Sequence, residues 1–241
     1  MTVAPALKPD ATLAELIREL PQASEVFEDA DIDYCCHGAR SLTEAARQAG
    51  YKPDEIISRL QAAEGRRAID WFQKPLSQVV AFLVSDHVKT ITVRAPAIRE
   101  AIERVIEIYG ELETLRRIRT LFSDLVSTIS THALKEEREL FPTIHDLDRV
   151  HNEGGQPPKL RLGPRILHEL VEHQTFRERA TTCQTLAQQL PEDVSVMFLR
   201  KELRTFGREL HNHMHLENNV LYPRAIEIEN ELRRSLVTTA L

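Results

Sequence analysis

Histidine interrupts four long amphipathic patterns in this chain, and two of the histidines are followed by glutamate at the fourth position. The six residues are His87, His132, Glu136, His173, His213 and Glu217. Side chains four residues apart lie one turn apart on the same face of a helix, so each His-x-x-x-Glu pair points two potential ligands into one space. Burying imidazoles and carboxylates without partners is strongly unfavourable. The spacing therefore predicts a metal site whose ligands are these six side chains.

The sequence intervals between the four histidines are nearly equal. They are 45, 41 and 40 residues, which is one long helix and one turn each time. In an up-and-down bundle such intervals return the chain to about the same height, so the histidines belong to one layer. Two segments, HALKEERELFP (132–142) and HMHLENNVLYP (213–223), also place Leu, an aromatic residue and Pro at the same offsets after the histidine. This match indicates a site built by two related halves.

The ligand types indicate which metal such a site would hold. Nitrogen and oxygen ligands without a thiolate favour iron, with manganese as the second choice, and six of them exceed the needs of one tetrahedral zinc ion. If Glu136 and Glu217 each bridge two metals, each ion receives two histidine nitrogens and two carboxylate oxygens. We therefore predict two iron ions per chain, bridged by both carboxylates and by an oxo or hydroxo group. A position left open on each ion would bind a small diatomic molecule such as dioxygen or nitric oxide.

Apolar residues recur at intervals of three, four and seven in the segments that carry these histidines. This periodicity predicts long helices near 76–108, 111–146, 163–190 and 193–233. Short connections make successive helices antiparallel neighbours, so we expect an all-α protein with an up-down-up-down four-helix bundle. In the third helix, Ile166 and Leu170 are placed on the buried stripe together with His173.

Three further histidines compete for places in the site. His168 lies two residues from Ile166 and therefore falls off the buried stripe of its helix. His211 and His215 flank His213 in sequence but lie about 200° round the helix from it. They are expected to face elsewhere and to have supporting or surface roles.

Short helical patterns at the start of the sequence predict a separate small domain over 1–63. A linker at 64–74 and the bundle at 75–241 are expected to follow it. The DYCCHG turn of the small domain contains the adjacent Cys35 and Cys36, followed by His37. Adjacent cysteines form a disulfide only with strained geometry, so we expect two free thiols. A neighbouring imidazole favours thiol exchange, metal transfer or contact with a cluster. The alternative is that both are small buried residues in a turn, and Cys183 is expected to be a core residue.

Composition excludes several classes of function. The chain has 241 residues with only 8 glycines and 5% aromatic residues, which disfavours β-sandwiches, barrels and glycine-rich nucleotide-binding loops. A net charge of -6 gives no electrostatic footprint for nucleic acid. No segment approaches the ~20 apolar residues of a membrane span. Three cysteines and the lack of a secretory pattern at the start of the sequence favour the cytoplasm.

These motifs resemble those of the iron-sulfur cluster repair di-iron proteins, the RIC family. The resemblance rests on the DYCC turn, on HALKEERELFP and HLENNVLYPRA, and on EHQ at 172–174. In this last segment Gln174 replaces the Asp or Glu that the family has at that position. The resemblance covers nearly the whole chain and implies an ScdA-type domain followed by a hemerythrin-like bundle. It also implies the same six metal ligands, although the segment around His87, SDHVKTITVRAP, departs from the His- and Arg-rich segment usual in the family.

The resemblance implies a cytoplasmic homodimer that helps to repair iron-sulfur clusters after nitrosative or oxidative stress. In the main hypothesis the His/Glu centre donates iron while Cys35 and Cys36 assist. One alternative is a protein that binds or senses nitric oxide or dioxygen, and another is a reductase that converts nitric oxide to nitrous oxide, so whether the protein is an enzyme stays open. The expected partners are damaged iron-sulfur proteins and small diatomic ligands, with no nucleic acid and no membrane.

Overall fold

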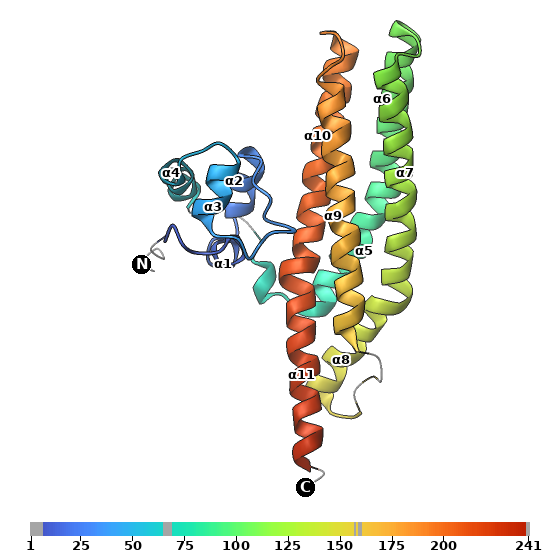
Figure 1. Ribbon diagram of the computed structural model, residues 1–241. Helices are drawn as coiled ribbons and strands as arrows, with labels where there is room; N and C mark the ends of the chain where they lie inside the picture. Colours follow the sequence, from blue (N-terminus) through green and yellow to red (C-terminus); the bar gives the residue numbers. More distant parts are fainter. Residues whose placement is uncertain (1–6, 65–68, 157, 159–160, 240–241) are drawn as a thin grey trace.

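The regular secondary structure of this chain is helical in the residues that the structure describes. In this computed structural model these are residues 7–64, 69–156, 158 and 161–239. Apart from an isolated bridge between Thr12 and Ser41, every regular element among them is a helix. Figure 1 shows long helices side by side, with a smaller group of helices against one flank. The prediction of an all-α fold is confirmed.

The small N-terminal domain consists of short helices, two of which begin at a side-chain cap. The helices are α1 (Leu13–Glu19), α2 (Ala23–Asp29), α3 (Leu42–Gln48) and α4 (Pro53–Ala63). The hydroxyl of Thr12 accepts a hydrogen bond from the amide of Glu15, and that of Ser41 accepts one from the amide of Glu44. Such caps satisfy amides that have no partner within the helix. The apolar faces of these helices form a core of their own around Phe27.

Four long rods form the bundle (Figure 1). The first is α5 (Leu76–Lys89), η2 (Thr90–Arg94) and α6 (Ala95–Tyr109), the second is α7 (Glu113–Lys135), η3 (Glu136–Leu140) and α8 (Phe141–Glu153), the third is α9 (Leu162–Ala187), and the fourth is α10 (Val194–His215), η4 (Leu216–Leu221) and α11 (Tyr222–Thr239). A single turn, η1 (Trp71–Gln73), precedes them. α6 packs against α7, α7 against α9, α9 against α10, and α10 against α6, which closes the bundle. Among the described residues, no helix is long and apolar enough to cross a membrane.

Three of the rods widen locally into the π-helical turns η2, η3 and η4, and a proline follows each turn. The prolines are Pro96, Pro142 and Pro223. The residues four positions before them, Thr92, Arg138 and Asn219, lie inside the π-helical turns. Proline lacks the N–H that would bond to the carbonyl at this position, and its ring collides with that carbonyl in an α-helix. A wider turn accommodates the proline, and two of these turns carry Glu136 and Glu217.

Two apolar clusters of the bundle lie on either side of the histidine layer. One contains Ile129, Phe176 and Met214, and the other contains Leu83, Phe141 and Val220. The prediction that Leu170 lies on the buried stripe is wrong, because it is 36% exposed while Glu169 is 3% exposed. Glu169 lies 2.9 Å from Nδ1 of His132 on α7, so a contact between two rods sets the rotation of α9 here.

The small domain packs against α9 and η4 through its DYCC turn. Asp33 pairs with Nε of Arg177 at 3.2 Å. Gly38 allows the close approach, because a Cβ atom at this position would lie 2.5 Å from Oδ1 of Asn219. Of the linker predicted at 64–74, residues 65–68 lie outside the described residues.

Candidate metal centre

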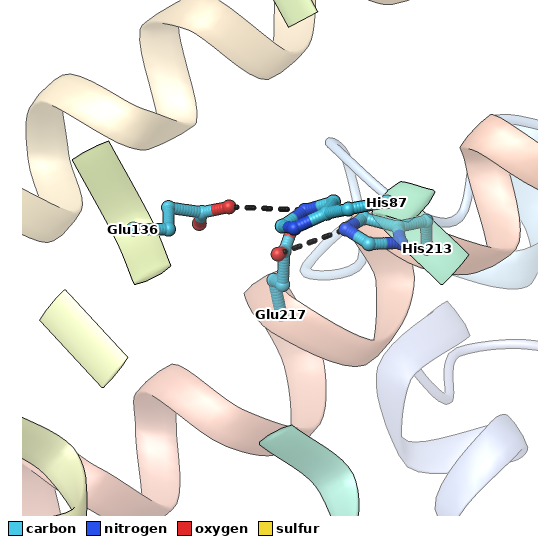
Figure 2. Close-up of side chains that lie close together, drawn as sticks. All are labelled: His87, Glu136, His213 and Glu217. Atoms are coloured by element: carbon cyan, nitrogen blue, oxygen red, sulfur yellow. Dashed lines mark hydrogen bonds and ion pairs between the residues drawn. The ribbon is translucent and has the colours of Figure 1, made fainter. Parts of the chain in front are cut away.

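The six residues selected from the sequence lie together in the middle of the bundle. They form two groups, and within each group the potential ligand atoms lie within 4.8 Å of one another. One group is His87, Glu136, His213 and Glu217, drawn in Figure 2, and the other is His132, Glu136, His173 and Glu217. Both carboxylates belong to both groups, as they would in a pair of ions bridged by two glutamates. All six residues are buried, with at most 7% of their surface exposed.

In each histidine, Nε2 faces a carboxylate of the centre. The distances are 3.4 Å for His87 to Glu136, 3.4 Å for His132 to Glu136, 3.3 Å for His173 to Glu217 and 3.1 Å for His213 to Glu217. The Nε2 atoms of His132 and His173 are 3.0 Å apart. Two imidazole nitrogens this close repel each other unless a proton or a cation lies between them. The centre is therefore arranged for positive charge at its middle.

The outward nitrogen, Nδ1, of every histidine lies within hydrogen-bond distance of an oxygen acceptor. The acceptors are Glu137 Oε1 for His87 (3.0 Å), Glu172 Oε2 for His132 (2.8 Å), Asn218 Oδ1 for His173 (2.8 Å) and Asp86 Oδ2 for His213 (2.9 Å). Each acceptor is the direct chain neighbour of a candidate ligand on a different rod, so the contacts run round the bundle. Acceptors at Nδ1 hold the proton there and leave the Nε2 lone pair for a metal.

The buried carboxylate oxygens test whether a metal fits. Within the described part of the chain, Oε2 of Glu136 and Oε2 of Glu217 have no hydrogen-bond partner. The nitrogens nearest to them are the Nε2 atoms, which lack a proton when Nδ1 carries it. A buried carboxylate oxygen without a partner is costly. The hydroxyl of Tyr222 donates to the other oxygen of Glu136, so a cation would complete the coordination of both carboxylates.

The pKa values show how strongly the centre attracts positive charge. Burial disfavours the imidazolium of His132, yet hydrogen bonds to glutamate and the neighbouring carboxylate charges raise its pKa to about 9. Burial also opposes protonation of His213, but Glu217 and Asp86 raise its pKa to about 10. Against burial, the histidines hold the pKa of Glu217 well below its ordinary range. The carboxylates therefore favour positive charge on His132 and His213, and a bound cation would take the place of the protons that supply it.

A small cavity of about 20 Å³ adjoins the candidate ligands. Its apolar lining comes from Ile129, Phe176 and Met214, and Thr90, the four histidines and Glu217 form the rest. A cavity needs roughly 10–15 Å³ to hold one water molecule. There is therefore room beside the centre for one ligand of about that size.

The adjacent cysteines lie outside the two His/Glu groups but are connected to them. Cys35 is buried, Cys36 is half-buried, and both are free thiols with their sulfurs 3.4 Å apart. The carbonyl of Cys35 accepts a hydrogen bond from Nδ2 of Asn218 at 3.0 Å. The other end of this amide contacts His173. Cys183 lies in an apolar cluster of the bundle, where burial raises its pKa to about 12.

The remaining histidines proposed as competitors do not join the centre. The side chain of His168 is 63% exposed. His211 faces the small domain and lies 3.2 Å from Glu28. His215 is buried against the edge of Tyr34 in the same interface. The last two therefore help to hold the domains together.

Sequence reasoning missed the residues that form hydrogen bonds with the candidate ligands. They are Asp86, Glu137, Glu172, Asn218 and Tyr222. A usable signal was present, because four of these polar residues stand directly beside a candidate ligand in sequence. On a helix such a neighbour lies 100° further round and faces the next rod.

Comparisons with known proteins match both parts of the chain. Residues 9–64 match ScdA_N, a domain of unknown function, and residues 78–225 match the hemerythrin HHE cation binding domain. The chain is 29% identical over 225 residues to the iron-sulfur cluster repair protein YtfE of Yersinia pseudotuberculosis serotype IB (strain PB1/+), covering 90% of this chain and 97% of the relative. It is 28% identical over the same extent to the protein of that name from Yersinia pestis (strain Pestoides F). These matches confirm the resemblance expected from the motifs.

Proposed function

The chain belongs to the hemerythrin HHE cation-binding family, and on this premise we propose that it helps to repair iron-sulfur clusters damaged by nitrosative or oxidative stress. The observation that carries the proposal is the pair of His/Glu groups that share Glu136 and Glu217. This centre would hold two iron ions per chain, bridged by both carboxylates and by an oxo or hydroxo group. The relatives named as repair proteins favour this function over sensing of nitric oxide or dioxygen and over nitric oxide reduction.

When bound, iron supplies the ions needed to rebuild a cluster and an open position for a diatomic ligand. The residues around the centre determine how tightly iron would be bound. The four Nδ1 contacts fix the imidazole rings, which favours tight binding. The hydroxyl of Tyr222 donates to Oε1 of Glu136 and holds Oε2 toward the histidines, which also favours tight binding.

The DYCC turn gives the centre a route to a partner protein. Cys36 is half-buried at the edge of the interface between the domains, and Cys35 is tied through Asn218 to His173. Thiols are the ligands that iron-sulfur clusters use in proteins. In the proposed reaction this pair contacts the damaged acceptor while iron leaves the bundle.

Two further parts of the proposal concern location and assembly. Three free cysteines in the described part of the chain suit a reducing compartment, so we place the protein in the cytoplasm. We also propose a homodimer, which sedimentation analysis would test. The proposed partners are damaged iron-sulfur proteins and small diatomic ligands. The proposal includes no binding to nucleic acid or to a membrane.

The test is transfer of labelled iron to a damaged acceptor. The protein is loaded anaerobically with ⁵⁷Fe and mixed with a purified [4Fe–4S] protein inactivated by nitric oxide. We expect label in the rebuilt cluster and recovery of the acceptor, and we expect Cys35→Ser/Cys36→Ser protein to retain iron but to repair less. If the label stays on the chain and the acceptor does not recover, the proposal is wrong.

A further inference from the structure

The DYCC turn carries a second cluster of potential metal ligands, separate from the His/Glu centre. The ligand atoms of Asp33, Cys35 and Cys36 lie within 4.8 Å of one another. The two sulfurs are 3.4 Å apart, and the sulfur of Cys35 is 3.4 Å from Oδ1 of Asp33. Two sulfurs bound to one tetrahedral zinc ion at about 2.3 Å would lie about 3.8 Å apart. The turn thus brings both thiols close to the separation that one ion requires.

Contacts from both domains hold this cluster in shape. The amide of Cys36 donates to Oδ1 of Asp33 at 3.1 Å, and Nε of Arg177 on α9 lies 3.2 Å from Oδ2 of the same carboxylate. On the bundle side, Asn218 and Asn219 donate to the carbonyl of Cys35 at 3.0 and 3.2 Å. A site whose ligands are already positioned loses less conformational entropy when it binds an ion.

The charges of the cluster indicate the class of ion. Two thiolates and the carboxylate of Asp33 carry three negative charges, and the guanidinium of Arg177 beside them carries one positive charge. The balance is two negative charges, which a divalent cation neutralises. Thiolate ligands favour zinc-type ions over magnesium or calcium.

We propose that Asp33, Cys35 and Cys36 bind one divalent, thiophilic cation of the zinc type. Half-buried Cys36 leaves a fourth position for water or an exchanging ligand, as in zinc sites with three protein ligands. The two sets of ligands share no residue, so binding of an ion at the cysteines can be measured separately from loading of the His/Glu centre with iron.

Binding at this site displaces the thiol protons. The hydrogen bond with Cys36, together with burial, raises the pKa of Cys35 well above its ordinary value, so this residue is a thiol without the ion. A metal ion takes up thiolates and releases their protons to solvent. The balanced step is one divalent cation and two thiols giving one dithiolate complex and two protons, with no change of oxidation state.

The experiment is an anaerobic titration of the reduced, metal-free full chain with Co²⁺. We expect three ions per chain, one of which produces a thiolate-to-cobalt charge-transfer band. Cys35→Ser/Cys36→Ser should bind one ion fewer and lose the band. Cys183→Ser is the matched control and should keep it. Asp33→Asn should bind this ion at least tenfold more weakly, since it loses a charged ligand.

A second measurement does not depend on any variant. With the bundle centre already loaded with iron, one equivalent of Zn²⁺ should slow alkylation of Cys36 at least tenfold. Unchanged alkylation, or a wild-type titration without a thiolate band, overturns the proposal. Iron bound in the bundle is counted separately, so failure at the cysteines is distinguishable from failure of the His/Glu centre.

Discussion

Asn218 accepts a hydrogen bond from Nδ1 of His173 through its Oδ1, at a distance of 2.8 Å. Its Nδ2 donates to the carbonyl of Cys35 in the small domain, and this donor fixes which end of the amide faces the histidine. The other three candidate histidine ligands have carboxylates at Nδ1. The one neutral acceptor of the four is therefore also the residue that joins the centre to the cysteine turn.

Replacing Asn218 should disturb both sites at once. In Asn218→Ala, His173 loses its acceptor and the Cys35 carbonyl loses a donor, so we expect iron affinity to fall about 10–100-fold and Cys36 to be alkylated faster. Asn219→Ala is the matched control, because Asn219 contacts the turn but none of the six candidate ligands. It should accelerate alkylation and leave iron affinity unchanged. Equal iron affinity in the two variants would contradict the role of Asn218.

The shared carboxylates should be required for loading with iron. Glu136→Gln and Glu217→Gln keep the size of the side chain but remove the charge needed to bridge two cations. We expect a folded bundle by circular dichroism with less than half of the wild-type iron. Glu139→Gln, on the same π-helical turn but paired with Arg165 at the surface, should load normally. Normal iron content in both test variants would refute the ligand assignment.

The hydroxyl of Tyr222 should help Glu136 to bind the metal, because it orients the carboxylate with Oε2 toward the histidines. Tyr222→Phe removes the donor that orients this carboxylate, so iron should be released to a chelator faster, by about tenfold. Tyr109→Phe, in the same bundle but at the end of α6, is the control and should release iron at the wild-type rate. Slower release from Tyr222→Phe would show that the hydroxyl competes with the metal for Glu136 instead.

The pair of Asp33 and Arg177 makes domain packing sensitive to acid. Burial alone would raise the pKa of Asp33, but Arg177 and the hydrogen bonds from His37 and Cys36 hold it below its ordinary value. The carboxylate therefore stabilises the fold above its unfolded-state pKa of about 3.9, and this stabilisation is lost as the pH falls through the lower folded value. Asp33→Asn should lower the free energy of unfolding by about 2 kcal/mol at neutral pH.

Urea unfolding in the presence of a chelator measures this difference without any contribution from bound metal. The gap between wild type and Asp33→Asn should close as the pH falls through the folded-state pKa of Asp33, which lies below its unfolded value. The exposed Asp31, in the same segment, supplies the control Asp31→Asn, which should match wild type. A gap that does not change with pH would mean that the charge of Asp33 is not what stabilises the interface.

Sequence periodicity predicted the four rods and the layer of histidines because both depend on spacing along one helix. It failed at Leu170, whose outward position is set by the contact between Glu169 and His132 on another rod. Contacts between the domains, such as that of Asp33 with Arg177, do not produce a periodic pattern in the sequence either. The π-helical turns could have been expected from Pro142 and Pro223 in the repeated motif, since proline cannot continue an α-helical hydrogen-bond ladder.

The most direct test of the central claim is the iron content of the purified full chain after anaerobic loading with Fe²⁺, measured with its visible spectrum before and after addition of nitric oxide. We predict two iron ions per chain, and a spectrum that nitric oxide changes. Well-folded protein that remains free of iron under these conditions would contradict the claim, because the six buried side chains would then be a polar core held together by protons and hydrogen bonds alone.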